Sequence, residues 1–263
     1  MNKTSPNDNE LSLTVLGTGD AFASKGRLYS SYLLERIRPE PGDARAVLLD
    51  CGPTTLTMLQ SMEFDFSLID LVILTHHHWD HIGGIPGLFL DFQYRSIRDR
   101  PLVVIGPSDT ENRCETFYQL GYTETYELKK RRYEVQYREL SEGSTEEILG
   151  LQIHSRKMVH QNHTLTLGYR FEWGGRTMGW SGDTEWNDAI VDLARDTDLF
   201  LTECFMTHNN LRFHTSLEDL VREAPRFNTK RILLTHMGET MLEKVAEGNL
   251  PFEAAQDGQK VTF

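Results

Sequence analysis

One internal stretch, Leu71–Gly84, constrains this chain more than any other part of the sequence. It opens with an apolar run typical of a buried strand and continues, after one threonine, with four histidines and an aspartate in six residues. Side chains alternate faces in an extended segment, so His76 and His78 point the same way and can bind one cation. Asp80 and His81 follow where the chain begins to turn, and they can hold a second cation beside the first. Such nitrogen and carboxylate ligands suit zinc, manganese or iron, and a paired site suits hydrolysis.

Clustered histidines also occur in purification tags and in solvated loops. A tag lies at a terminus and lacks the aspartate, whereas this cluster is internal, follows a strand and precedes two glycines. His77 is expected not to bind metal, because alternation sends its side chain to the opposite face. The metal interpretation is therefore favoured for the other four residues.

The pattern His-x-His-x-Asp-His followed by Gly-Gly resembles the signature of the metallo-β-lactamase superfamily. Further segments resemble other motifs of that superfamily, and they occur in the same order along the chain. These segments are Gly17–Phe22, Leu48–Gly52, Asn162–His163, Ser181–Thr184, Leu233–His236 and the C-terminal strand at Lys260–Phe263. The resemblance therefore runs nearly end to end.

The resemblance implies a site for two divalent metal ions, with zinc favoured and manganese or iron as alternatives. The first ion would be held by three histidines, the second by an aspartate and two histidines, and a further aspartate would bridge the two. In that order the ligands are His76, His78 and His163, then Asp80, His81 and His236, and finally Asp183. A water shared between two such ions, about 3.5–4 Å apart, ionises near neutral pH and attacks phosphorus or a carbonyl carbon. Asp80 can also orient this nucleophile or receive its proton.

Two histidines compete for the third motif. His163 is preferred because Asn162 precedes it as in the family, although its spacing to Gly168 is slightly short. His160 would then contact the ligands without binding metal itself, or it would be a loop residue. The sequence leaves the choice between His160 and His163 open.

Two segments after Asp183 bear on the substrate. Thr202–Phe205 and Phe213–Ser216 resemble paired acidic and histidine motifs of the ribonuclease Z branch, whose members hydrolyse phosphodiesters. By that resemblance His214 is a catalytic candidate that stabilises the transition state or protonates the leaving oxygen, with Glu203 holding its ring. The alternative is that His214 only leads into a helix.

Ribonuclease Z carries a long basic arm that grips tRNA between its third and fourth motifs. Here only two predicted strands and the turn Trp173–Gly175 lie between His163 and Asp183, so no arm fits. The chain resembles armless relatives, which include cyclic phosphodiesterases. The formal net charge of −12 also disfavours large RNA as a partner. The one local basic cluster, Lys129–Arg132, is interpreted as a solvated strand edge.

We therefore expect a phosphodiesterase that acts on a small or cyclic substrate. Hydrolysis of a lactone, ester or thioester by the same site is the enzymatic alternative. A metal-binding accessory protein without turnover is the non-enzymatic one. A homodimer is compatible with the ribonuclease Z branch.

Composition predicts a soluble cytoplasmic protein. Hydrophobic residues make up 39% and charged residues 25% of the chain, and no apolar run reaches the length of a membrane span. The polar N-terminus lacks a secretory signal. Three widely spaced cysteines argue against a disulfide framework, and Cys51 and Cys204 are interpreted as buried apolar residues.

The resemblance implies an α/β (α+β) fold, the four-layer αββα sandwich of the superfamily. Residues 1–263 are expected to form a single hydrolase domain, because no long Gly-, Ser- or Pro-rich linker divides them. Strands are predicted at Leu11–Leu16, Ser30–Glu35, Ala46–Asp50, Leu71–Thr75, Leu102–Ile105, Tyr133–Leu140, Glu147–Lys157, Thr164–Trp173, Thr177–Trp180, Asp198–Thr202 and Arg231–Thr235. Helices are predicted at Thr54–Met62, Ile85–Ser96, Thr110–Leu120, Glu185–Arg195, Ser216–Arg226 and Glu239–Glu247.

Overall fold

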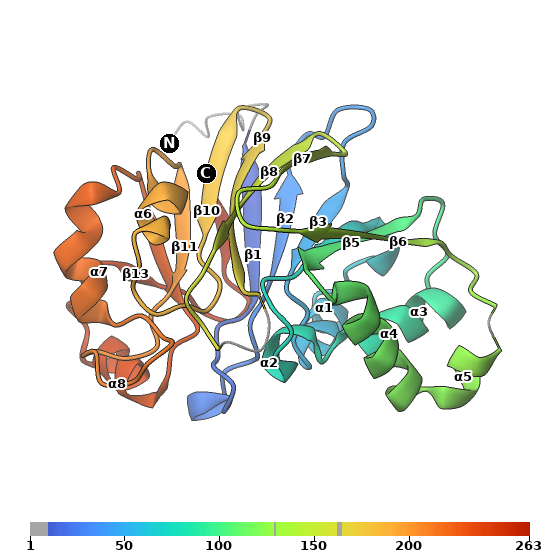
Figure 1. Cartoon of the computed structure of the whole chain (residues 1–263), viewed down its shortest axis with the longest axis horizontal. Helices are drawn as coiled ribbons and strands as arrows, with labels where there is room; N and C mark the ends of the chain where they lie inside the picture. Colours follow the sequence, from blue (N-terminus) through green and yellow to red (C-terminus); the bar gives the residue numbers. More distant parts are fainter. Residues whose placement is uncertain (1–9, 129, 162–164) are drawn as a thin grey trace.

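Two mixed β-sheets lie face to face in the centre of the protein, and helices cover their outer faces (Figure 1). The computed structural model describes residues 10–128, 130–161 and 165–263. The predicted four-layer αββα sandwich is confirmed. Within the described residues, no helix combines the length and the apolar character that crossing a bilayer requires.

The first sheet has seven strands in the order β14-β1-β2-β3-β4-β5-β6, and the strands from β3 to β6 run parallel. Its strands are β1 (Leu11–Gly17), β2 (Ser31–Arg36), β3 (Ala46–Leu49), β4 (Ile69–Ile73), β5 (Leu102–Pro107), β6 (Val135–Leu140) and β14 (Lys260–Thr262). Its outer face carries α1 (Thr55–Ser61), α2 (Trp79–Ile82), α3 (Ile85–Tyr94), α4 (Thr110–Gly121) and α5 (Thr123–Glu127).

The second sheet also has seven strands, in the order β13-β12-β11-β10-β9-β8-β7, and β10 to β13 run parallel. Its strands are β7 (Thr145–Ile148), β8 (Leu151–Lys157), β9 (Leu167–Trp173), β10 (Arg176–Trp180), β11 (Leu199–Glu203), β12 (Ile232–Thr235) and β13 (Glu253–Ala254). Its outer face carries α6 (Ala189–Ala194), α7 (Leu217–Glu223) and α8 (Glu239–Glu247). Short 3-10 turns lie at Ser24–Gly26, Phe66–Leu68 and Ala224–Arg226.

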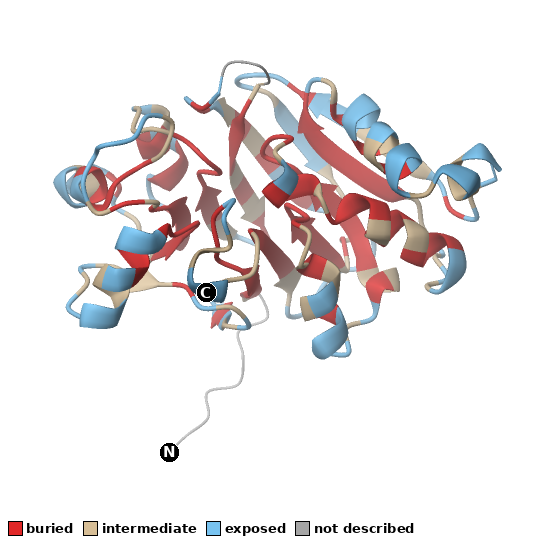
Figure 2. Cartoon of the chain, turned by 90° about the horizontal axis from the view of Figure 1, so that it is seen from below, coloured by how far each residue is buried: buried red, intermediate tan, exposed pale blue. Residues whose placement is uncertain are grey.

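Alternation along the strands builds separate apolar layers. In β1, Leu13 and Val15 pack between the two sheets, whereas Leu16 packs against the helices of the first sheet. In β11, Leu201 faces the other sheet and Phe200 faces the helices of its own side. Period-two patterning thus gives each inner strand two buried faces. Figure 2 shows the result, with buried strands inside and exposed residues along the outer helix surfaces.

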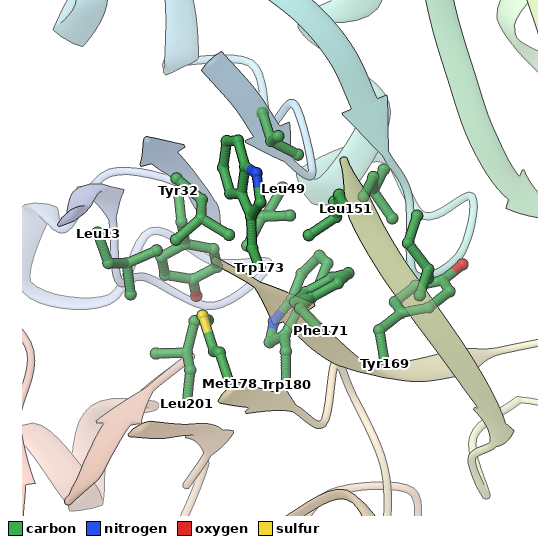
Figure 3. Packing of buried hydrophobic residues seen from close by; sticks show 14 of the residues in the cluster. Leu13, Tyr32, Leu49, Leu151, Tyr169, Phe171, Trp173, Met178, Trp180 and Leu201 are labelled. Atoms are coloured by element: carbon green, nitrogen blue, oxygen red, sulfur yellow. The ribbon is translucent and has the colours of Figure 1, made fainter. Parts of the chain in front are cut away.

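Large aromatic side chains fill the space between the sheets (Figure 3). Trp180 lies edge-on to Tyr32 at 6.0 Å between ring centroids and tilted over Tyr169 at 5.9 Å. Both tyrosine hydroxyls are buried and reach across the sandwich. The Tyr32 hydroxyl bonds the Thr235 hydroxyl at 2.6 Å, and the Tyr169 hydroxyl donates to the carbonyl of Leu74 at 2.8 Å. These bonds tie β2 to the end of β12 and β9 to the residue that follows β4.

The structure differs from the predicted elements at several places. The strand predicted at Glu147–Lys157 is the hairpin of β7 and β8, because Leu149 and Gly150 turn the chain with positive φ angles of 48° and 77°. The helix predicted at Glu185–Arg195 is limited to Ala189–Ala194, since the chain before it makes an isolated bridge to Val159. Helices α2 and α5 were not predicted because each spans little more than one turn.

The basic cluster Lys129–Arg132 is only partly the solvated edge that was expected. Arg131 makes two hydrogen bonds to the Glu115 carboxylate, at 2.8 and 2.6 Å, and its guanidinium lies 5.3 Å from the centroid of the Tyr118 ring. Lys129 lies outside the described residues. The three cysteines are buried and form no disulfide, as predicted.

Candidate metal centre

Ligand-type side chains gather at the C-terminal ends of strands from both sheets. The loop after β4 carries His76 and His78, and the chain after β12 carries His236. The chain after β10 carries Asp183, and His160 follows the end of β8. Parallel strands bring their carboxyl ends to one edge of a sheet, so residues far apart in the sequence meet between the two sheets.

The first ligand group consists of three imidazoles. His76 Nε2 lies 3.0 Å from His78 Nδ1, and His160 Nε2 lies 3.2 Å from the same His78 atom. These three nitrogens therefore point at one common position. His76 and His160 are buried and His78 is half-buried, so the position lies at the floor of an accessible site.

The second ligand group is Asp80, His81, Asp183 and His236, all of them buried. His81 Nε2 lies 3.2 Å from Asp80 Oδ2 and 3.3 Å from Asp183 Oδ2. His236 Nε2 lies 3.2 Å from the same Asp183 oxygen, which is also 3.9 Å from His76 Nε2 of the first group. Asp183 thus stands between the two groups.

Hydrogen bonds on the outer side of each ring decide where its proton lies. His81 Nδ1 lies 2.6 Å from the Asp50 carboxylate, which can only accept a hydrogen bond from it. His236 Nδ1 faces Ser30 Oγ at 3.0 Å, and that hydroxyl already donates its own hydrogen to Gly19 O. Both rings therefore carry their proton on Nδ1 and leave the Nε2 lone pair inside the site.

The same logic applies to the first group. Thr75 Oγ1 donates to the Asp50 carboxylate at 2.9 Å, so it accepts from His76 Nδ1 at 3.0 Å. His160 Nδ1 donates to the main-chain carbonyl of Phe213 at 2.9 Å. In both rings the Nε2 lone pair again faces inward.

Inward lone pairs at these distances from one another require a positive charge between them. His81 Nε2 is buried, makes no hydrogen bond to any described residue and faces two carboxylate oxygens. A lone pair directed at an anionic oxygen about 3 Å away is repulsive unless a cation separates them. The neutral imidazoles and carboxylates have the donor chemistry that zinc and related divalent ions prefer. The residues present therefore fit divalent metals.

Burial and charge shift the histidine pKa values in opposite directions, downward at His76 and His160 of the first group and upward at His81 of the second. Burial lowers the pKa of His160 to about 4 and also lowers that of His76, so both rings favour the neutral, ligating form. Burial opposes ionisation of Asp80, but the neighbouring His81 lowers the pKa of Asp80 to about 2. Burial also opposes a charge on His81, yet Asp183 and Asp80 raise the pKa of His81 well above its ordinary value. The second group thus attracts positive charge.

Backbone strain is concentrated around the site. Asp50, Phe213 and His236 adopt left-handed conformations, with φ angles of 52°, 75° and 49°. Non-glycine residues in this region cost about 1–3 kcal/mol each, which the surrounding contacts must offset. Gly182, at φ 58°, precedes Asp183, and an added Cβ there would lie 2.7 Å from the Thr75 side chain. The turn that delivers Asp183 therefore requires glycine.

His214 and Glu203 form a pair beside the two ligand groups. His214 Nδ1 lies 3.1 Å from Glu203 Oε2, and the other Glu203 oxygen accepts the Thr184 main-chain N–H. Burial works against a charged His214, but Glu203 raises the pKa of His214 to about 9. His214 also lies close to both ligand groups. One of its ring nitrogens, one of those of His160 and a carboxylate oxygen of Asp183 all lie within 4.8 Å of one another. The Glu203 carboxylate thus favours the protonated form of His214 at the edge of the site.

The structure brings together most of the residues named from the sequence. His163 lies outside the described residues, and His160 completes the first group where His163 was expected. His77 belongs to neither ligand group and bonds the Thr110 hydroxyl at 2.8 Å. Trp79 is half exposed and lies edge-on to Phe117 on the outer surface.

Sequence reasoning missed the residues that orient the ligands. Asp50 was recognised only as part of a turn, although it holds the ring of His81 directly and that of His76 through Thr75. Ser30 was predicted only as the start of a strand and Phe213 only as the start of the segment that carries His214, because their contacts with the ligands join distant segments.

Comparison with known proteins agrees with this geometry. The family described as anti-Pycsar protein Apyc1 matches residues 11–259. The chain belongs to this family. It is similar to a ribonuclease Z of Geobacillus kaustophilus, with 26% identity over 92% of this chain and 94% of the relative.

Solved structures show the same fold. A diphosphatase of the PhnP family superposes with a TM-score of 0.76 at 19% identity, covering 96% of this chain and 98% of the other. The short form of human tRNase Z superposes with a TM-score of 0.72 at 22% identity, covering 95% and 98%. The protein is a metal-dependent hydrolase of the metallo-β-lactamase superfamily, in its ribonuclease Z-like branch.

Proposed function

We propose that this protein is a phosphodiesterase that uses two divalent ions, zinc in the first place, to hydrolyse a small or cyclic phosphodiester. The observation that carries the proposal is the pair of ligand groups that share Asp183, with the protonated His214 beside them. The similarity to a ribonuclease Z and to a diphosphatase fold favours phosphorus over carbon as the electrophile.

Each residue has a distinct part in such a reaction. Divalent ions held by the two groups supply an ionised water at neutral pH and offset the charge that develops on the phosphoryl oxygens. Asp80 orients the attacking oxygen and can accept its proton. His214, held through Nδ1 by Glu203, donates a proton to the oxygen that leaves when the P–O bond breaks. Water adds across the bond, and one product carries the phosphate.

A cavity next to His160 supports a small substrate. Its volume is about 450 Å³, within the range of roughly 300–1,000 Å³ that small-molecule sites occupy. Its wall carries Arg113, which is paired with Asp109 at 2.7 Å, and Lys157, while Ser108 and Thr166 supply hydroxyls. The net charge of −12 argues against a long RNA backbone as the ligand.

Hydrolysis of bis(p-nitrophenyl) phosphate tests the proposal. Wild-type protein reconstituted with Zn²⁺ or Mn²⁺ is expected to turn over this diester, whereas Asp183→Ala under the same conditions is expected to be inactive. His214→Ala is expected to keep both metals and lose phosphodiesterase activity. Turnover of lactones or thioesters that is indifferent to His214 would instead favour the carboxylic-ester alternative. Absence of any ester hydrolysis with both metals bound would favour an accessory role.

A cytoplasmic location and a homodimeric state stay predictions. Light scattering coupled to size-exclusion chromatography measures the second directly, with a molar mass near twice the 30.3 kDa of one chain expected.

A further inference from the structure

We propose that Glu185 is a positioning residue for the metal centre, because it joins the three segments that carry His160, Asp183 and His214. The inference rests on the proposed metal site and concerns a residue just beyond the Ser-Gly-Asp-Thr segment. Glu185 follows Asp183 by two positions, and its side chain is 33% exposed. It is placed to act on the ligands without touching a metal or a substrate.

The first contact is between main chains. Glu185 N–H donates to the carbonyl of Val159 at 2.8 Å, and the two residues form an isolated antiparallel bridge. His160 is the next residue along the chain. The bridge therefore fixes the segment that delivers His160 against the segment that delivers Asp183.

The second contact is made by the carboxylate. Glu185 Oε2 accepts the main-chain N–H of Phe213 at 3.1 Å, while the Phe213 carbonyl accepts from His160 Nδ1 at 2.9 Å. Phe213 thus stands between the two side chains, bonded to Glu185 through its N–H and to His160 through its C=O. That geometry needs the left-handed conformation of Phe213, with φ at 75°, which a residue with a Cβ adopts reluctantly.

The orientation of His160 therefore depends on Glu185 through Phe213. The carboxylate of Glu185 stabilises the conformation of Phe213, the Phe213 carbonyl fixes the proton of His160 on Nδ1, and His160 Nε2 is left free to bind metal. His214 follows Phe213 directly, so the same conformation also sets the backbone that presents His214 to the site. Removing the carboxylate releases both histidines together.

A simpler function for Glu185 would be a surface ion pair. Its contact with Arg212 is 3.9 Å long, and the Arg212 side chain is 78% exposed. A long pair with so exposed a partner contributes little to stability. The bond to the Phe213 N–H is shorter and lies beside the site, and it is therefore the contact that matters.

Zn²⁺ affinity, measured by competition with a chromogenic chelator, tests the proposal without requiring turnover. Glu185→Ala is expected to weaken binding at the first ligand group by about 10-fold, the lower end of the range for residues bonded directly to a ligand, because Glu185 acts on His160 through Phe213. Glu185→Gln keeps an oxygen that accepts the Phe213 N–H, and it is expected to remain within about threefold of wild type. On bis(p-nitrophenyl) phosphate, Glu185→Ala is expected to lower kcat more than it changes KM.

Substitutions at Phe213 supply the matched control. Phe213→Gly and Phe213→Ala both remove the ring, but only glycine adopts a positive φ freely. In the Glu185→Ala background the glycine variant is expected to bind Zn²⁺ about fivefold more tightly than the alanine variant, or better. If Glu185→Ala does not fold, the same comparison in the otherwise wild-type chain carries the test.

Three results would overturn the proposal. These are wild-type Zn²⁺ affinity in Glu185→Ala, equal loss in Glu185→Ala and Glu185→Gln, and no difference between glycine and alanine at Phe213. Failure of the proposed function has another signature, namely tight Zn²⁺ binding by the wild type without hydrolysis of any ester. If the wild type binds no Zn²⁺ at all, both proposals fail together.

Discussion

Replacement of Asp50 by asparagine tests the ligand geometry with a change of one atom. Asp50 is buried and accepts three hydrogen bonds, from the Thr75 N–H, the Thr75 hydroxyl and His81 Nδ1. Because Oδ1 accepts the main-chain N–H at 2.8 Å, the amide oxygen of asparagine must take that position. The amide NH₂ group then replaces Oδ2 and meets the His81 N–H at 2.6 Å, donor against donor.

The clash moves the proton of His81. The ring can accept from the new amide only if its hydrogen shifts to Nε2, which is the atom that faces Asp80 and Asp183. To bind a metal through Nε2, His81 must return its hydrogen to Nδ1, and the hydrogen bond from the new amide to Nδ1 is then lost. A hydrogen bond to a charged group contributes about 1.5–3 kcal/mol, so Zn²⁺ affinity at the second ligand group should fall by about 10- to 150-fold.

Chelator competition measures this loss, and calorimetry gives the number of Zn²⁺ ions bound. Asp65→Asn is a matched control, because Asp65 lies at an exposed turn and, among the described residues, its side chain accepts a hydrogen bond only from the Ser67 N–H. We expect the control to bind Zn²⁺ as tightly as wild type. Unchanged affinity in Asp50→Asn would refute the assignment of the His81 proton, and with it the argument that Nε2 is a ligand.

Further predictions concern ligands, catalysis and stability. His160→Ala should weaken Zn²⁺ binding at the first group at least about 10-fold, whereas His163→Ala should leave it unchanged; chelator competition on the two variants decides between these histidines. His214→Ala should lower kcat about 10²- to 10⁴-fold, the range for a lost proton donor, with metal content unchanged by elemental analysis. Arg113→Ala with Lys157→Ala should raise KM for a small anionic diester more than it lowers kcat in steady-state assays. Zn²⁺ at about a thousand times its Kd should stabilise the fold by about 4 kcal/mol, and calorimetric scans should show Tm roughly 8–16 °C lower after removal with a chelator.

Local patterns in the sequence predicted most strands and helices, and the resemblance to the superfamily predicted how they are layered. The apolar run before Thr75 gave strand β4, and the histidine and aspartate spacing that follows gave four ligand-type residues that the structure brings together. Alternation predicted that His77 would point away, and it bonds Thr110 instead of joining a ligand group. These features depend on a few adjacent residues, which is why the sequence carries them.

Features that depend on distant segments were not predictable. Nothing near Phe213 in the sequence indicates that its carbonyl meets His160, which lies 53 positions earlier. The role of Ser30 requires a contact with His236, 206 positions away. Long-range packing decides such details, and a single sequence does not display it.

Side-by-side turnover of a small cyclic phosphodiester and a precursor tRNA tests the central claim most directly. The Zn²⁺-loaded protein would be given a 3′,5′-cyclic nucleoside monophosphate in one assay and a 3′-extended tRNA in the other, with Asp183→Ala as the control. We predict opening of the cyclic diester by wild type, no cleavage of the tRNA, and no activity in the variant. Cleavage of the tRNA without hydrolysis of the cyclic diester, or equal activity in Asp183→Ala, would contradict the account.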